Sequence, residues 1–236
     1  MSKEHIISAG MFPNPILCVK GLSWCPNDFK EIPVASFTKR ILCERHNEFL
    51  GRKIDRAGIA AMTAFRDEVL INNARTAMKP IRWTIKEFRI DGRGLERWCV
   101  KTLINVTAEG EYRIGRDSEV IGQPSARLVR IAFGQENFRS RAGLYGLGAL
   151  GNLKIKDGFR VIPYIDKDET LLGGLFGIHG YRFLLFFEEE GVNRTMSVPD
   201  LDDGPDYETQ TLYPLLAVNF KIGKYLSHRL KFDYRY

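Results

Sequence analysis

Two short stretches of the chain combine residue types that can hold metal ions or transfer protons. Near the start, Glu4 and His5 stand side by side ahead of Ile6 and Ile7, a composition typical of the end of a β-strand. Further along, Cys43 and His46 are three positions apart, and thiolate sulfur and imidazole nitrogen are ligands that zinc prefers. Glu4 and His5 belong either to a catalytic strand or to an ordinary N-terminus. Which of the two applies depends on the strands and helices that position both stretches.

Four cysteines bear on the zinc question. Cys18 and Cys25, taken with Cys43 and His46, would supply a Cys₃His ligand set for one structural zinc ion. The spacing between Cys18 and Cys25 is longer than in the usual zinc knuckles. The alternative is that the cysteines are packed without metal, with Cys43 at the start of a helix.

The composition predicts a globular protein in the cytoplasm. No apolar run approaches the roughly 20 residues that span a bilayer, and the first ten residues lack the apolar core of a signal peptide. The charge is uneven, because residues 1–118 carry 20 Lys/Arg and 14 Asp/Glu, whereas the remaining 118 residues carry 15 of each. Such a basic half suits a nucleic-acid backbone as a partner and gives no reason to expect a membrane. The alternative is a solvated basic face.

The pattern of hydrophobic residues and turns predicts an α+β fold with an antiparallel C-terminal sheet. Residues 1–75 are expected to form a small module of short strands followed by a long helix from Glu44, in which Gly51 and Gly58 permit a break near either position. Residues 76–236 form a second, accessory α+β domain. Its expected elements are a strand at 82–90, a turn at 91–94, a helix at 95–106, a short helix within 123–138, and strands at 153–155, 159–165, 180–187, 215–222 and 228–234, the last two joined as a hairpin.

The helix at 95–106 has a basic, aromatic face that could lie along a nucleic-acid backbone. We favour the interpretation that Trp98, Cys99 and Leu103 pack in the core and that Arg97 and Lys101 remain in water.

The two stretches together resemble the HNH endonucleases of the ββα-metal fold. The resemblance lies in Ser2-Lys3-Glu4-His5-Ile6-Ile7 followed by Leu42-Cys43-x2-His46-Asn47-x3-Gly51-x2-Ile54-Asp55, so it covers roughly residues 2–55. It is closest to the subgroup in which the second knuckle reads Cys-x-x-Cys-Asn. In that fold a β-hairpin and a helix hold one divalent cation against the scissile phosphate.

The resemblance implies a role for each matching residue. His5 would be the general base, and Glu4 and Asn47 would hold a catalytic Mg²⁺ ion. Cys43 and His46, with Cys18 and Cys25, would hold the structural Zn²⁺. Five basic residues would contact the nucleic-acid backbone, DNA being the expected substrate: Lys39, Arg40, Arg45, Arg52 and Lys53.

Three departures from the family pattern leave a second interpretation open. No Cys-x-x-Cys precedes Glu4, His46 stands where the family has a cysteine, and Ser8 stands where the family has a proline. Under that interpretation His5 is a solvated histidine, and His46 and Asn47 are ordinary residues of a helix N-terminus.

The sequence therefore predicts an HNH-like, metal-dependent nuclease that hydrolyses phosphodiesters, of the kind found in phage defence, mobile elements and toxins. The alternative is a catalytically inactive, HNH-derived module that binds nucleic acid or protein. A third hypothesis assigns the function to the C-terminal sheet, as a surface for a protein partner.

Overall fold

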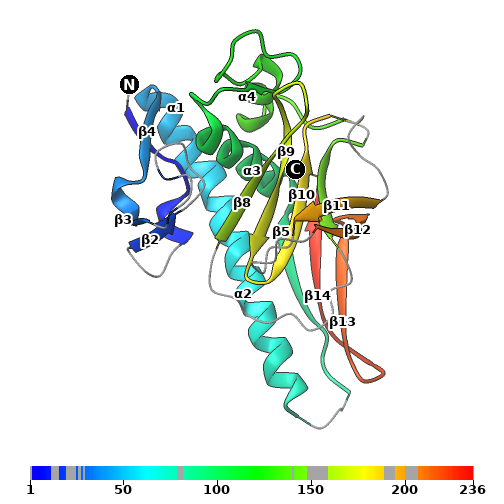
Figure 1. Ribbon diagram of the computed structural model, residues 1–236. Helices are drawn as coiled ribbons and strands as arrows, with labels where there is room; N and C mark the ends of the chain where they lie inside the picture. The colour runs from blue at the N-terminus through cyan, green and yellow to red at the C-terminus, as the bar shows by residue number, and fades with distance from the viewer. Residues whose placement is uncertain are drawn as a thin grey trace.

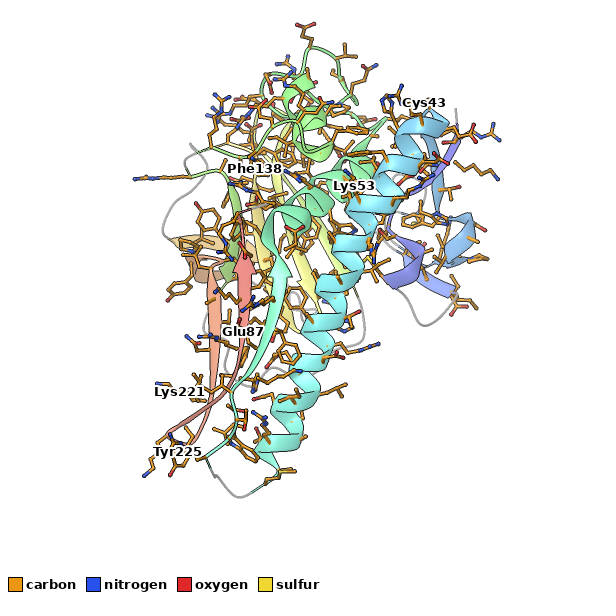
Figure 2. The ribbon with its side chains drawn as sticks, turned by 180° about the vertical axis from the view of Figure 1, so that it is seen from behind. Cys43, Lys53, Glu87, Phe138, Lys221 and Tyr225 are labelled. Atoms are coloured by element: carbon orange, nitrogen blue, oxygen red, sulfur yellow. The ribbon has the colours of Figure 1, made fainter. Side chains whose placement is uncertain are left out.

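The structure is a computed structural model, and it describes residues 2–11, 16–19, 25, 28, 30–78, 82–139, 141–147, 159–188, 195–199 and 207–235. The α+β prediction is confirmed. A long helix separates four short N-terminal strands from the larger sheets, and the views from both sides show this arrangement (Figures 1 and 2). None of the helices in the described ranges has the length and apolar character that crossing a membrane requires.

The N-terminal strands form two antiparallel pairs, β1 with β4 and β2 with β3. Single turns of 3₁₀-helix lie at Ala9–Met11 and Val34–Ser36. The four strands are β1 (Ser2–His5), β2 (Ile16–Val19), β3 (Lys30–Pro33) and β4 (Thr38–Leu42).

The long helix is continuous through three segments, and where Gly51 or Gly58 permits a break, the α-helix changes to a π-helix around Gly51. It consists of α1 (Glu44–Phe49), a π-helical segment (Leu50–Asp55) and α2 (Arg56–Thr76). Gly51 lies in the π-helical segment. Gly58 is required for packing, because a Cβ atom there would lie 2.4 Å from the Trp98 ring.

The helix α3 (Gly92–Thr107) forms the centre of the core. Trp98, Leu95 and Leu103 are fully buried, which confirms the expected packing of this helix. Residues 91–94, predicted as a turn, instead begin the helix, since Asp91 is its N-cap and accepts a hydrogen bond of 2.8 Å from the Gly94 N–H. The short helix expected within 123–138 is α4 (Ala126–Ala132), with Ser125 as its N-cap.

Two sheets cover the core on the other side of the long helix. The larger sheet has the strand order β11-β12-β7-β10-β9-β6, with β8 also paired to β9, and the smaller has the order β13-β14-β5. The β13–β14 and β10–β9 pairs are antiparallel, whereas β5 runs parallel to β14. The strands are β5 (Lys86–Asp91), β6 (Arg113–Ile114), β7 (Gly143–Leu147), β8 (Phe159–Ile165), β9 (Thr170–Ile178), β10 (Tyr181–Phe186), β11 (Thr195–Pro199), β12 (Tyr207–Pro214), β13 (Ala217–Ile222) and β14 (Tyr225–Asp233).

These strands agree in part with the predicted ones. The strand β8 has the predicted bounds, and β13 and β14 form the predicted hairpin, with Ile222 opposite Tyr225. The strand predicted at 153–155 lies outside the described residues. One hydrophobic cluster contains buried residues from both sides of the predicted boundary at residues 75 and 76, among them Phe65, Trp98 and Phe232. The division into two domains stays a prediction.

A buried polar network ties α2 to both sheets. The Tyr181 hydroxyl donates to Glu68, whose other carboxylate oxygen lies 2.6 Å from His228 Nε2. His228 Nδ1 lies 2.8 Å from Ser227 Oγ, which accepts a 3.0 Å hydrogen bond from Arg75. A His228 ring protonated on Nε2 satisfies every one of these contacts. Ser227, His228 and Glu68 match the residue types of a hydrolase triad, but all three are fully buried, so the network is structural.

Gly173 in β9 allows the tightest approach between strands. A Cβ atom at Gly173 would lie 1.9 Å from the Leu185 carbonyl oxygen of β10. We predict that Gly173→Ala lowers the free energy of unfolding by about 3 kcal/mol, since the backbones of two buried strands would have to separate. Gly51→Ala is the control, because its Cβ atom meets nothing within 4 Å and alanine favours a helix by up to about 1 kcal/mol. Urea denaturation measures both, and equal stabilities would contradict the packing.

A second prediction concerns the pH dependence of stability. Glu96 of α3 has a side chain only 8% exposed, and burial raises the pKa of its carboxyl to about 7, opposed by the Leu144 N–H. The folded state therefore binds a proton more tightly than the unfolded chain, in which this group titrates near 4.5. Below pH 4.5 the protonated Glu96 contributes its full share to the free energy of unfolding. We expect this contribution to fall by about 3 kcal/mol as the pH rises from there through 7. Glu96→Gln should flatten this fall, and an unchanged pH profile would contradict the assignment.

Candidate functional site

The first strand and the start of the long helix lie next to each other. The strand β1 pairs antiparallel with β4, and His5, the last residue of β1, lies opposite Thr38. The helix α1 begins two positions after β4 ends, and Asn47 Nδ2 donates hydrogen bonds to Ser2 Oγ (3.0 Å) and the Lys3 carbonyl (2.8 Å). The strand–strand–helix order that the resemblance implies is thus present, although this order alone is not specific to one family.

The Glu4 side chain points into the protein and meets a lysine from the centre of the core. Its carboxylate forms an ion pair with the Lys101 ammonium, which also donates a 2.6 Å hydrogen bond to Asp55 Oδ1. The side chains of Glu4 and Lys101 are 3% and 2% exposed, and that of Asp55 is 16% exposed. One ammonium therefore lies between two carboxylates. The prediction that Lys101 remains in water is wrong.

The electrostatics of this cluster follow from its burial. Burial raises the pKa of the Glu4 carboxyl above its ordinary value, and the neighbouring Lys101 ammonium opposes that change. Asp55, a second negative charge nearby, adds to the increase. Removing a buried partner of this kind leaves a charge without compensation, so Lys101 is required for both carboxylates to lie here.

The π-helical segment places Asp55 at this point. Leu50 and Ile54 of the segment are buried, and Asp55 ends it beside Lys101. A wider helical turn shifts the direction of every later side chain, and such turns are frequent at functional sites. The π-helical segment therefore orients the carboxylate of Asp55, the last residue of the HNH-like motif.

His5 is half-buried, and its backbone carbonyl is fixed by a hydrogen bond. Asn105 of α3, which is 2% exposed, donates a hydrogen bond of 3.2 Å to the His5 carbonyl. Lys39 lies opposite Glu4 in the strand pair and donates a 2.7 Å hydrogen bond to the Ala108 carbonyl at the end of α3. Burial lowers the pKa of the Lys39 ammonium. The two strands are thus fixed to α3 by both hydrogen bonds. Lys39 therefore has a structural role, and its contact with a phosphate stays a prediction.

Of the four expected zinc ligands, the structure places two, Cys43 and His46, next to each other. Both side chains are exposed, and Sγ of Cys43 lies 3.3 Å from Nδ1 of His46. Figure 2 shows Cys43 at the first turn of the long helix. Cys25 is buried, and within the described residues no three His, Cys, Asp or Glu side chains form a group that could hold a metal ion. The Cys18 side chain lies outside the described residues, so the Zn²⁺ site stays a prediction.

The arrangement around Glu4 does not fit a catalytic Mg²⁺ ion. Mg²⁺ requires near-octahedral oxygen ligands and retains several waters. The Glu4 carboxylate instead contacts an ammonium in a nearly water-free position, and the Asn47 amide nitrogen is directed at β1. Because the Lys101 ammonium already occupies the position between Glu4 and Asp55, we derive no reaction step through a metal at these residues.

Four of the five expected phosphate contacts are exposed on β4 and the first turns of the helix. They are Arg40, Arg45, Arg52 and Lys53. Arg52 forms a surface ion pair of 3.2 Å with Glu48, and the Lys53 ammonium lies 5.2 Å from the centre of the Phe49 ring. Exposed pairs of this kind contribute little to stability, so these cations are available to a ligand.

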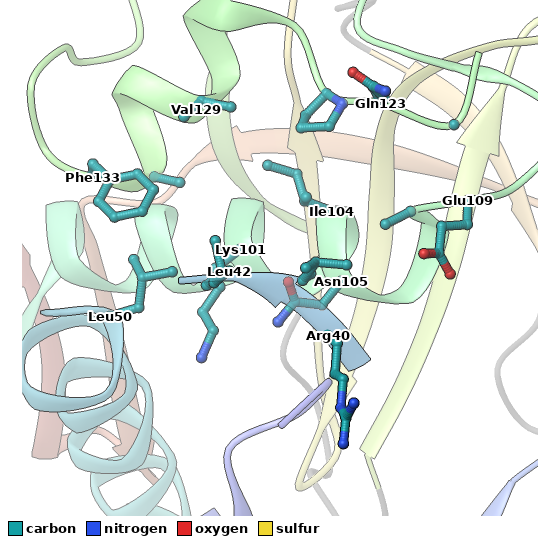
Figure 3. A pocket seen from close by; sticks show the side chains of 15 residues that line it. Arg40, Leu42, Leu50, Lys101, Ile104, Asn105, Glu109, Gln123, Val129 and Phe133 are labelled. Carbon is teal, nitrogen blue, oxygen red and sulfur yellow. The ribbon is translucent and has the colours of Figure 1, made fainter. Parts of the chain in front are cut away.

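A cavity of about 360 Å³ lies beside this surface (Figure 3). It is enclosed by β4, the start of the π-helical segment, α3, α4 and the loop at residues 122–124. The residues that line it are Arg40, Ile41, Leu42, Leu50, Lys101, Ile104, Asn105, Ala108, Glu109, Gly122, Gln123, Pro124, Val129, Ala132 and Phe133.

Three residues of this region were missed by reasoning from the sequence. Lys101 and Asn105 have the spacing of neighbours on one helix face, but α3 is buried on nearly all sides, so an amphipathic pattern could not identify them. Phe133 follows α4 and has no motif around it. The signal that could have indicated Lys101 is a cation within the mostly apolar stretch from Trp98 to Val106.

Comparisons of the chain with models of known protein families, with curated proteins and with solved structures find no match. The resemblance therefore depends on the motifs within residues 2–55 alone.

The ion pairs of Lys101 lead to a prediction on stability. Lys101→Met keeps the length of the side chain but leaves Glu4 and Asp55 without their cation, so we expect the free energy of unfolding at neutral pH to fall by about 3–5 kcal/mol. Adding Glu4→Gln should restore part of this loss, because the second variant removes one buried charge. Arg97→Gln, one turn earlier on α3, is the control and should cost less than about 1 kcal/mol, since its hydrogen bond to Asn137 is exposed. Strictly additive effects of the two substitutions would show that Glu4 and Lys101 do not interact.

Proposed function

We propose that the N-terminal part of this protein is a nucleic-acid-binding module of the HNH type that does not cleave its ligand. The observation that carries the proposal is the Lys101 ammonium between Glu4 and Asp55. An HNH nuclease needs the acid beside its histidine to hold a divalent cation, and here a lysine within the fold balances that acid.

The exposed cations support nucleic acid as the ligand. Arg40, Arg45, Arg52 and Lys53 lie on consecutive elements, β4 and the long helix that follows. Exposed cations on neighbouring elements can neutralise a phosphate backbone, and their contacts position the ligand without specifying its sequence. The excess of Lys/Arg over Asp/Glu in residues 1–118 agrees with this surface.

A metal-dependent nuclease is the second candidate. It is favoured by the position of His5 at the end of β1 and by the hydrogen bonds of Asn47 to the same strand. A protein partner for the C-terminal sheets stays a prediction, and no specific contact supports it.

We expect binding of DNA or RNA that weakens steeply as salt increases. In Arg45→Gln/Lys53→Gln the slope of log affinity against log salt concentration should fall by about 2, since each phosphate contact contributes about 0.9. The matched control is Lys221→Gln/Lys224→Gln, because these exposed lysines lie at the β13–β14 hairpin, far from α1 (Figure 2). Fluorescence anisotropy at several salt concentrations measures the slopes.

The same preparations distinguish the two candidates. Supercoiled plasmid incubated with the protein and Mg²⁺ or Mn²⁺ should remain intact at concentrations where it is fully bound. Nicking that disappears in His5→Ala would overturn the non-catalytic proposal in favour of the nuclease. Equal slopes for the parent and the Arg45/Lys53 variant would contradict the assigned surface.

A further inference from the structure

The cavity beside the basic surface has an apolar side and a polar side. Leu50, Val129 and Phe133 lie on one side in Figure 3, and Arg40, Glu109 and Gln123 lie around the other. Its volume of about 360 Å³ is at the lower end of the range of about 300–1,000 Å³ for small-molecule sites. A ligand that fits is therefore small and has both an apolar face and polar edges.

Phe133 is a prearranged surface for a planar ring. Its ring is stacked on Phe49, with centroids 5.7 Å apart and planes inclined by 25°, and the His46 ring contacts it edge-on at 5.1 Å. These two contacts hold Phe133 from the side of the long helix, while Phe133 also lines the cavity. An aromatic ring held in place can stack on a base with little loss of conformational freedom.

The polar side offers the groups that recognise a nucleotide. Gln123 is exposed at the rim and Asn105 lies deeper, and each amide can both donate and accept a hydrogen bond. The hydrogen bond from Asn105 to the His5 carbonyl fixes the orientation of that amide. Arg40 is exposed on β4, and its guanidinium group matches the geometry of a phosphate.

We propose that this cavity receives one unstacked base of a single-stranded nucleic acid, with the base on Phe133 and an adjacent phosphate at Arg40. The inference rests on the proposed function, because it specifies which form of nucleic acid the module prefers. A base within a duplex must first be unpaired and unstacked, which costs a few kcal/mol, so single strands or frayed ends are the preferred ligands. An acyl chain would make no use of the Arg40 guanidinium or of the Gln123 amide at the rim, which argues against a lipid.

The test compares affinities for a short single-stranded DNA and for its duplex at constant salt. The parent protein should prefer the single strand, and Phe133→Leu should weaken its binding by about tenfold, as loss of one base–aromatic stack does. The salt slope should not change, because the phosphate contacts remain. Gln123→Ala is the second variant, since an exposed side chain can be removed without threatening the fold, and it should also weaken single-strand binding. Ile121→Ala is the control, because Ile121 is 60% exposed and does not line the cavity.

A 2-aminopurine base in the single strand gives an independent signal. Its fluorescence should change when the parent protein binds and should remain unchanged with Phe133→Leu. Binding that is equally tight in the parent, Phe133→Leu and Gln123→Ala would overturn this inference and leave the proposed function intact. No binding of either form of DNA or of RNA at low salt would overturn the proposed function and the inference with it. A fluorescent fatty acid that binds in the cavity and is not displaced by the single strand would overturn the inference alone.

Discussion

The burial of a single ammonium group between two carboxylates is the constraint on which the arrangement of this protein depends. Lys101 comes from the central helix α3, Glu4 from the first strand and Asp55 from the long helix. A buried charge without a partner costs several kcal/mol, so none of the three elements can move away without a large loss of stability. Because hydrophobic packing has no preferred direction, the ion pair, together with the hydrogen bonds of Asn47 and Asn105 to β1, selects one position of β1 against the helices.

Other polar contacts add to this ion pair in linking the N-terminal strands to the helices. The hydrogen bonds from Lys39 to the Ala108 carbonyl and from Asn105 to the His5 carbonyl fix β4 and β1 to α3. The network around Glu68 fixes α2 to the sheets on its other side. The proposed function follows from the difference between two sets of charges. The Glu4 carboxylate is enclosed with Lys101, whereas Arg40, Arg45, Arg52 and Lys53 face solvent.

Local patterns in the sequence predicted the elements that depend on local interactions. The strand β8 and the β13–β14 hairpin depend on neighbours along the chain, and the structure contains both. The strand β9 was missed because Gly173 and Gly174 weaken a strand pattern. Glycine is required at Gly173 because β10 approaches there, which the chain does not show locally. Asp91 and Gly92 have the composition of a turn, yet the same residues suit a helix N-cap.

The candidate site was predictable only in part for the same reason. The residue types of Glu4, His5 and Asn47 led to the prediction of metal-dependent phosphodiester hydrolysis. The partner of Glu4, however, lies on a helix far along the chain. No spacing rule connects Glu4 with Lys101, and their contact exists only because the fold buries both. The cavity likewise combines residues from β4 to Phe133, so it could not be inferred from any single motif.

Titration of the purified protein with Mn²⁺, followed by electron paramagnetic resonance of the free ion, shows whether Lys101 or a divalent ion balances the charge of Glu4. If it is Lys101, the Mn²⁺ signal is the same in the presence of the parent protein and of Glu4→Gln. Uptake of one equivalent of Mn²⁺ by the parent protein that is lost in Glu4→Gln would contradict the assignment to Lys101.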